Sequence, residues 1–146
     1  MLRTCRLEDL EQVHEIEEAS FPDDAYNTSA FLFFLVTASD GFIVACHGEK
    51  VVGYVIATRR SGEGLIQSIA VSPGFRRRGV GRMLMQSAMG RLAARVKRVY
   101  LQVDAKHEGT IRFYHGLSFS ETGRVLRRYY PNGDDAVAMV RELSPP

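Results

Sequence analysis

Apolar residues recur every three positions near the N-terminus, and this period predicts an amphipathic helix. The apolar face of that helix would consist of Leu7, Leu10, Val13 and Ile16. Ser20-Phe21-Pro22 predicts its end, because proline disfavours the α conformation in the residue before it. The aromatic-rich stretch Asn27–Val36 predicts a second helix.

Runs of β-branched and aromatic residues predict strands in the middle of the chain. Phe42–His47 and Val51–Thr58 flank Gly48-Glu49-Lys50, which is the pattern of a hairpin. Leu65–Val71 predicts a buried strand, and Ser72-Pro73-Gly74 closes it.

A long helix and a further strand follow a glycine-rich loop. The helix is predicted from an apolar stripe at four-residue spacing, formed by Val80, Leu84, Ala88, Leu92 and Val96. Val99–Val103 predicts a strand, on which Tyr100, Gln102 and Asp104 share one face.

The remainder predicts a short helix and two strands. The helix covers Gly109–Leu117, with Tyr114 directed inward, and the strands cover Phe119–Arg128 and Ala136–Leu143. Strands that alternate with helices, with antiparallel hairpins at both ends, predict an α/β (α+β) fold. We expect one domain over residues 1–146.

The composition is that of a globular domain. The 146 residues are 45% hydrophobic and 25% charged. The longest strictly apolar run, Ala30–Val36, is far shorter than the roughly 20 residues that cross a bilayer. No secretory signal pattern is visible, and Cys5 and Cys46 lack the spacing of metal ligands. We therefore expect a cytoplasmic protein with no metal and no membrane contact.

Charge is unevenly distributed, although the formal net charge is only +2. Residues 1–40 hold two basic and nine acidic side chains, a net charge of −7. Residues 76–98 carry a net charge of +8, from Arg76, Arg77, Arg78, Arg82, Arg91, Arg95, Lys97 and Arg98. This basic segment predicts an anion-binding region.

The loop Arg76–Gly81 stands where a strand passes into a helix, and a helix N-terminus offers unpaired amides to a phosphate. Gly79 and Gly81 allow the backbone to approach that phosphate closely. The Gly-Lys-Ser/Thr ending of a Walker loop and the three-glycine dinucleotide spacing are both missing.

These residues resemble the core motif of the GCN5-related N-acetyltransferase (GNAT) family. The motif is Ser68-Ile69-Ala70-Val71-Ser72-Pro73 followed by Arg76-Arg77-Arg78-Gly79-Val80-Gly81, and the likeness continues through Ile111-Arg112-Phe113-Tyr114. Ser20-Phe21-Pro22 and residues 129–139 are similar to the subfamily that acetylates protein N-terminal α-amines. The resemblance implies a mixed, mostly antiparallel sheet with about four helices, and acetyl-CoA as the cosubstrate.

The resemblance also implies which residues bind acetyl-CoA: loop amides hold the pyrophosphate, and strand amides meet the thioester and pantetheine. The corresponding residues here are Ile69, Ala70, Val71, Arg76, Arg77, Arg78, Gly79, Val80, Gly81, Arg82 and His107. His107 stands where the family has an asparagine.

For catalysis, the resemblance makes Tyr114 the general acid that protonates the CoA sulfur, with simple core packing as the alternative. Gln102 stands where the ribosomal-protein enzymes have a glutamate base. Because an amide cannot accept the proton, Gln102 can only position a water. Asp23 is the second candidate for the base, and Asp104 and His107 are further options.

A site without a strong base favours an α-amine acceptor. Neutralising an α-amine near pH 7 costs roughly 1 kcal/mol, and a lysine costs about 4 kcal/mol. By resemblance, the aromatic pair Tyr129 and Tyr130 closes over the first peptide residues, and an ordinary turn is the alternative. Phe21, Pro22 and Tyr26 would form the opposite wall.

Other function classes remain open at this point. A small-molecule amine is the alternative acceptor, and a non-catalytic acyl-CoA-binding module is the alternative class. Nucleic-acid binding through the arginines is disfavoured, because no aromatic residues are interleaved with them. Both a monomer and a homodimer are compatible with the sequence.

Overall fold

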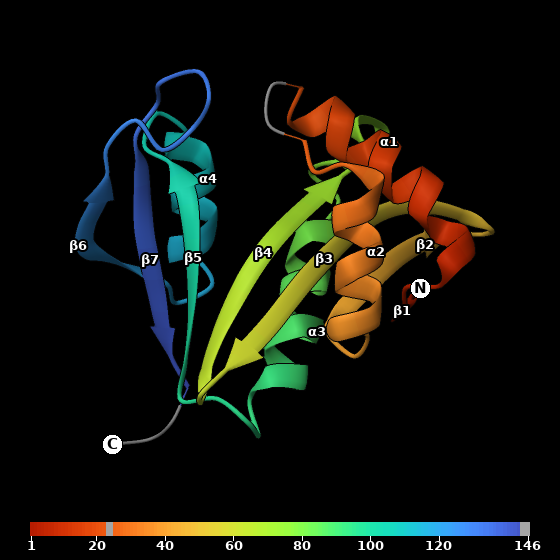
Figure 1. Ribbon diagram of the computed structural model, residues 1–146, viewed down its shortest axis with the longest axis horizontal. Coiled ribbons are helices and arrows are strands. Elements are labelled where there is room, and N and C mark those ends of the chain that lie inside the picture. The colour runs from red at the N-terminus through yellow and green to blue at the C-terminus, as the bar shows by residue number, and fades with distance from the viewer. Residues whose placement is uncertain (23–24, 144–146) are drawn as a thin grey trace.

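A seven-stranded sheet runs through the molecule in the order β1-β2-β3-β4-β5-β7-β6 (Figure 1). The computed structural model describes residues 1–22 and 25–143. Within these residues β4 and β5 pair in parallel and every other neighbouring pair is antiparallel, which confirms the predicted mixed sheet. The strands are β1 (Leu2–Thr4), β2 (Phe42–His47), β3 (Lys50–Arg60), β4 (Glu63–Val71), β5 (Arg98–Asp104), β6 (Ser120–Leu126) and β7 (Ala136–Glu142).

Helices cover both faces of the sheet. α1 (Leu10–Ser20) and α2 (Thr28–Thr37) pack on one face, and α3 (Val80–Leu92) and α4 (Glu108–His115) pack on the other. Figure 1 shows α1, α2 and α3 gathered around β2–β4, with α4 beside β5 and β7. Short 3-10 turns precede α1 (Leu7–Asp9) and α3 (Pro73–Phe75).

Alternating side chains of the central strands divide the core into two layers. Val44 and Tyr54 belong to the layer under α1 and α2, whereas Ile43 and Val55 belong to the layer under α3. Because both faces of β2 and β3 are covered, these strands carry nearly continuous apolar sequence.

The predicted elements are confirmed, with shifts at several ends. The assignment of Leu7 to the buried helix face is wrong, because Leu7 begins the 3-10 turn before α1 and is 65% exposed. Val96 is buried as predicted but lies four residues beyond the end of α3. Asn27 caps α2, since its side-chain oxygen accepts the Ala30 N–H at 2.9 Å. β1 was not predicted, because three residues are too few to show a period.

Candidate active site

The two parallel strands separate soon after they pair. β4 and β5 pair at three successive positions, of which Leu65–Tyr100 is the last. One rung later the register between β3 and β4 shifts at Gln67, and such a bulge bends the strand that carries it. From Ile66 onward β4 therefore pairs with β3 alone. The predicted thioester contacts Ile69, Ala70 and Val71 lie on this stretch, where backbone groups on the β5 side have no ladder partner.

The predicted phosphate loop leads from β4 into α3. Gly79 is the N-cap of α3 with φ +84°, and Arg77 has φ +62°. Glycine adopts this left-handed conformation without steric cost. The first amides of α3, beginning at Val80, have no intrahelical acceptor, and the helix dipole adds partial positive charge there. A β-carbon at Gly81 would meet Phe113 and Val71 only at ordinary contact distances, so the fold itself does not require this glycine.

Four arginines surround the loop, and one of them is already engaged. Arg76 donates from Nε to Val71 O at 2.9 Å and from Nη2 to Ser20 Oγ at 3.1 Å, which ties the end of β4 to α1. The Arg78 guanidinium lies 5.4 Å from the centre of the Phe75 ring. Arg77 and Arg82 are exposed. The loop amides, Arg77, Arg78 and Arg82 are thus the groups free to meet phosphates.

The prediction that residues 76–98 form one anion-binding region is wrong for its second half. α3 has 13 residues and is roughly 20 Å long, so Arg91 and Arg95 lie at the opposite end from the loop. Arg98 forms ion pairs with Glu63 at 2.8 Å and with Glu142 at 3.1 Å. The helix separates charges that are adjacent in sequence.

Tyr114, the predicted proton donor, is buried on the inner side of α4. Its ring packs edge-on against Phe113 and Phe119, with centroid distances of 5.2 and 5.9 Å. Its hydroxyl forms no hydrogen bond with any residue that the structure describes. Burial, with a smaller contribution from Tyr130, raises the pKa of Tyr114 well above its ordinary value. The phenol is therefore protonated at neutral pH and has a hydrogen atom to donate.

The candidates for the base differ in the exposure of their side chains and in the hydrogen bonds that these side chains form. Gln102 is exposed on β5 and pairs with Ala138 across the strand. Asp104 is buried, and its Oδ1 accepts the Lys106 N–H at 2.9 Å, so it shapes the turn before α4. His107 is the exposed N-cap residue of that helix, without a side-chain cap bond. Asp23 lies outside the described residues.

Sequence reasoning missed a buried carboxylate beside the site. Glu17 of α1 is only 2% exposed. Its Oε1 accepts hydrogen bonds from the hydroxyl groups of Tyr54 and Ser68, the latter at 3.0 Å. Its Oε2 accepts the Tyr26 N–H at 3.0 Å. The signal was present, since Glu17 stands four residues after Val13 on the apolar face of the helix.

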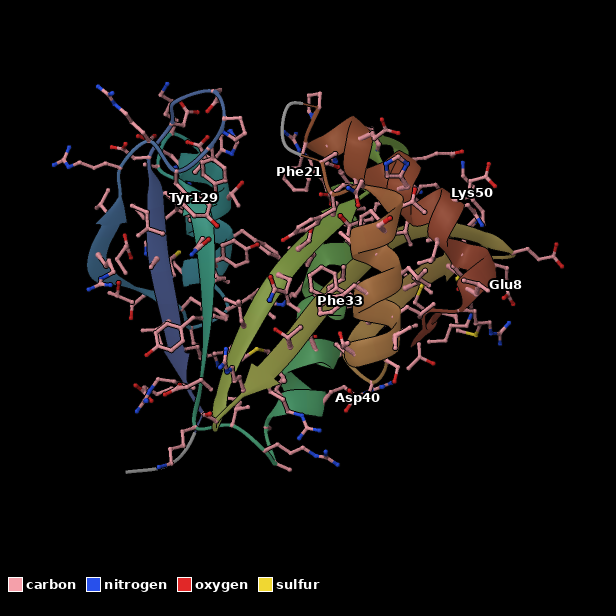
Figure 2. All side chains as sticks on the ribbon, viewed as in Figure 1. Glu8, Phe21, Phe33, Asp40, Lys50 and Tyr129 are labelled. Atoms are coloured by element: carbon pink, nitrogen blue, oxygen red, sulfur yellow. The ribbon has the colours of Figure 1, made fainter. Side chains whose placement is uncertain are left out.

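The predicted substrate walls lie at one end of the sheet. Figure 2 shows Phe21, at the end of α1, and Tyr129, on the β6–β7 connection, at the same end of the sheet. Tyr26 contacts Phe34 with ring centroids 5.6 Å apart, and its hydroxyl donates to Gln67 O at 3.4 Å. Tyr129 and Tyr130 form an edge-on pair with centroids 5.0 Å apart.

Pro22 is exposed after α1, next to Phe21. On the other wall, the β6–β7 connection is tied to the turn before α4, because Lys106 Nζ pairs with Asp134 at 2.6 Å. The Lys106 ammonium also lowers the pKa of Asp134. The structure thus brings both predicted walls to the end of the sheet where β4 and β5 diverge.

The model of the acetyltransferase (GNAT) family matches residues 10–119. The chain belongs to the GNAT acetyltransferase family. This confirms the resemblance read from residues 68–81, and with it the prediction of an acetyl-CoA-dependent acetyltransferase.

Relatives of this GNAT chain include an N-alpha-acetyltransferase of Sulfurisphaera tokodaii, 31% identical over 97% of this chain and 92% of the relative. A ribosomal protein bS18-alanine N-acetyltransferase of Salmonella typhimurium is 33% identical over 66% of this chain and 67% of the relative. Among solved structures, Ard1 from Thermoplasma volcanium superimposes with a TM-score of 0.93 and 28% identity, covering 99% of this chain and 98% of that one.

Within residues 1–22 and 25–143, no three His, Cys, Asp or Glu side chains are grouped so that they could hold a metal ion. In the same residues no helix has the length and apolar character needed to span a bilayer.

Proposed function

We propose that this acetyltransferase transfers the acetyl group of acetyl-CoA to the N-terminal α-amine of a polypeptide, within one ternary complex. The observation that carries the proposal is the parting of β4 and β5. The loop that we expect to bind anions lies at the end of β4, and two connections that carry aromatic residues lie at the end of the sheet where these strands diverge. The names of the Sulfurisphaera and Salmonella relatives support an α-amine as acceptor. We further propose that one acetyltransferase domain spans residues 1–146.

In this proposal the cosubstrate lies along the exposed edge of β4 and the start of α3. The amides of Val80, Gly81 and Arg82 receive the pyrophosphate, and Arg77 and Arg78 add positive charge. Arg76 contributes by fixing the end of β4. His107 stands at the start of α4, where it meets the pantetheine arm.

Transfer requires the amine nitrogen to attack the thioester carbon, the carbon–sulfur bond to break, and protons to move twice. Backbone N–H groups of Ile69 or Val71 polarise the carbonyl oxygen, and Ala70 lines the same edge. The Tyr114 hydroxyl donates its proton toward the departing sulfur. A water positioned by Gln102, or the carboxylate of Asp23, takes the proton from the amine.

The polypeptide N-terminus enters between the two aromatic walls. Phe21, Pro22 and Tyr26 form one wall, and Tyr129 and Tyr130 form the other. An α-amine fits a site whose base is weak, because it costs only about 1 kcal/mol to neutralise near pH 7.

The test is thiol release from acetyl-CoA with three classes of amine: peptides with a free α-amine, lysine peptides with a blocked N-terminus, and polyamines. We expect turnover with the first class, and mass spectrometry should place the acetyl group on the α-nitrogen. The same peptide carrying an acetylated N-terminus is the matched control and should be inert. Turnover confined to polyamines would establish a small-molecule enzyme, and acetyl-CoA binding without turnover on any amine would establish a non-catalytic module.

A further inference from the structure

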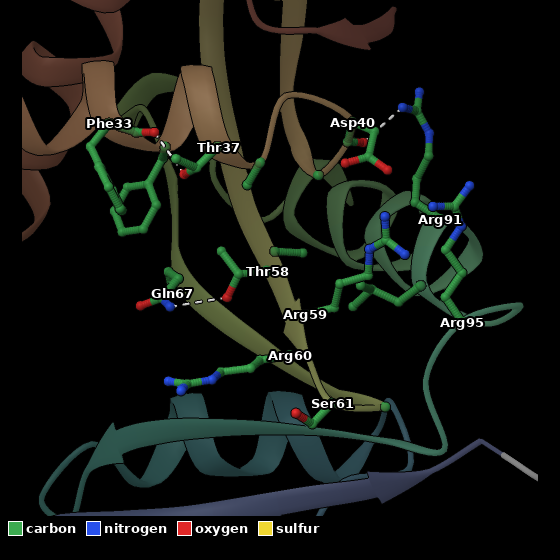
Figure 3. A pocket seen from close by; sticks show the side chains of 16 residues that line it. Phe33, Thr37, Asp40, Thr58, Arg59, Arg60, Ser61, Gln67, Arg91 and Arg95 are labelled. Carbon is green, nitrogen blue, oxygen red and sulfur yellow. Dashed lines mark hydrogen bonds between the residues drawn. The ribbon is translucent and has the colours of Figure 1, made fainter.

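A second concave region lies at the free edge of β3, away from the phosphate loop. β3 and β4 extend beyond the first residue of β2, so the last residues of β3 have no strand on that side. A pocket of about 740 Å³ occupies this edge. α2 supplies an apolar wall with Phe33 and Phe34, and the end of α3 closes the opposite side (Figure 3). The volume lies in the range of ligand-binding pockets, about 300–1,000 Å³.

The pocket is strongly basic. Its lining includes four arginines, namely Arg59, Arg60, Arg91 and Arg95, against one acid, Asp40. Arg91 Nη1 donates to the backbone oxygen of Asp40 at 2.8 Å, so this hydrogen bond does not involve the Asp40 carboxylate. Arg59, Arg60 and Arg95 form no ion pair with any residue in the described part of the chain. Nearby Arg98, by contrast, is neutralised by two glutamates. Like charges around a concave surface concentrate a positive potential.

Two residues that line the pocket contact Tyr26 of the proposed substrate wall. Gln67 lines the pocket, and its backbone oxygen accepts the Tyr26 hydroxyl. Phe34, another lining residue, contacts the Tyr26 ring. Side chains alternate along β3, which places Arg60 on the same face as Tyr54, toward α2, and Arg59 on the opposite face. In Figure 3 the Arg60 side chain is drawn between Gln67, which also lines the pocket, and the ribbon of β5.

We propose that this pocket binds acidic side chains near the N-terminus of the polypeptide substrate, with Arg60 as the principal contact. The inference rests on the proposed function, and it adds a sequence preference to it. Guanidinium groups pair with carboxylates in two-point geometry, and the apolar wall favours a peptide that carries an apolar residue beside the acid. A basic residue at the same place would be repelled by uncompensated arginines.

The experiment compares peptides that share an N-terminal residue and differ by Glu, Gln or Lys at each of positions 2 to 5. With wild-type protein at low salt, kcat/KM for the best Glu peptide should exceed that of its Gln counterpart about fivefold, mainly through KM, and salt should reduce the difference. Arg60→Gln should bring the ratio close to one. Arg124→Gln, which removes an equal charge from exposed β6, is the matched control and should keep the ratio.

Direct binding of a fluorescent Glu peptide and of its Gln counterpart is measured in parallel, so that the pocket is tested even without turnover. Tighter binding of the Glu peptide that is lost in Arg60→Gln supports the proposal even if no peptide is acetylated, a result that would sink only the proposed function. Equal binding and turnover of both peptides overturns the proposal, as does an equal loss in Arg124→Gln. Arg60-dependent binding of an RNA oligonucleotide in place of the acidic peptide would overturn it too.

Discussion

Two tyrosines, Tyr54 and Tyr114, are buried to nearly the same extent but differ at the hydroxyl group. The Tyr54 hydroxyl donates to Glu17 and lies 3.0 Å from Ser68 Oγ, within a network that joins α1, β3 and β4. The Tyr114 hydroxyl has no hydrogen-bond partner among the residues that the structure describes. Burial raises the pKa of both phenols.

The comparison shows that burial alone does not separate a structural tyrosine from a chemical one. A buried hydroxyl that is fully bonded stabilises the fold, and removing one partner leaves the others unsatisfied at a cost of about 1–3 kcal/mol. A hydroxyl without a protein partner contributes little to folding and is available to a ligand atom. The proposed roles therefore predict opposite responses to the loss of the same oxygen.

The largest expected effect is on turnover in Tyr114→Phe. Losing the proton donor to the CoA sulfur should lower kcat by about 100-fold or more. The melting temperature should remain close to that of wild type, because no described residue loses a hydrogen bond. Steady-state thiol release and thermal denaturation measure the two effects, and wild-type turnover would remove Tyr114 from the mechanism.

The next effect concerns the other end of the Tyr54 network. Glu17→Ala removes the acceptor of the Tyr26 amide and of both hydroxyls, which can then donate only one to the other, so the free energy of unfolding should fall by about 2–4 kcal/mol. Glu17→Gln is the matched control: its amide oxygen can accept from Tyr26, and both hydroxyls can turn to accept from its nitrogen. Urea denaturation reports stability, and equal stability of the two variants would contradict the network.

Glu17→Gln also separates positioning from proton transfer. If Glu17 only holds the Tyr26 segment, Glu17→Gln should retain most of its kcat with an unchanged pH profile. Glu17→Ala should raise the KM for the peptide more than the KM for acetyl-CoA. A large loss of kcat in Glu17→Gln would mean that the carboxylate itself accepts a proton.

Tyr54→Phe should be milder, destabilising the protein by about 1–3 kcal/mol, because Glu17 keeps its bonds from Ser68 and Tyr26. Its kcat should stay near that of wild type, the reverse of Tyr114→Phe. Measuring kcat and the free energy of unfolding for both variants gives the direct comparison. A Tyr54→Phe variant that is as stable as wild type but inactive would erase the distinction between the two tyrosines.

The smallest expected effect is a loss of stability at high pH, and it should have the same sign for both tyrosines. Their folded-state pKa values lie above the ordinary value of 10.0, so the unfolded chain releases these protons first as pH rises. The contribution of each tyrosine to the free energy of unfolding is therefore complete below pH 10. Above pH 10 it falls by at most about 1.4 kcal/mol per pH unit for each tyrosine. Urea denaturation between pH 9 and 11.5 should show a shallower decline in each Phe variant, and identical slopes would contradict the assignment.

Most of the fold could be predicted because its signals are local. The helix ends at Ser20 and Asn27, the hairpin around Gly48 and the glycine loop before α3 each depend on neighbouring residues. The candidate loop and Tyr114 were found through the order of motifs along the chain. The prediction was wrong for residues that are near in sequence but distant in space. Arg91 and Arg98 follow the loop in sequence, but α3, with 13 residues, separates them from it, and they bind other partners.

By itself, the sequence determined the order of the four helices and of the strands from β2 onward, the glycine-rich loop, the family and the glutamine at position 102, since these are properties of residues close together in the chain. Only the tertiary structure decided that Glu17 joins Tyr54 and Ser68, that Tyr114 keeps a hydroxyl without a described partner, and that arginines from β3 and α3 share a pocket. The reason is physical: burial and hydrogen bonding depend on which segments the sheet brings together. In this chain, Glu17 is 37 residues away from Tyr54 and 51 residues away from Ser68 in the sequence.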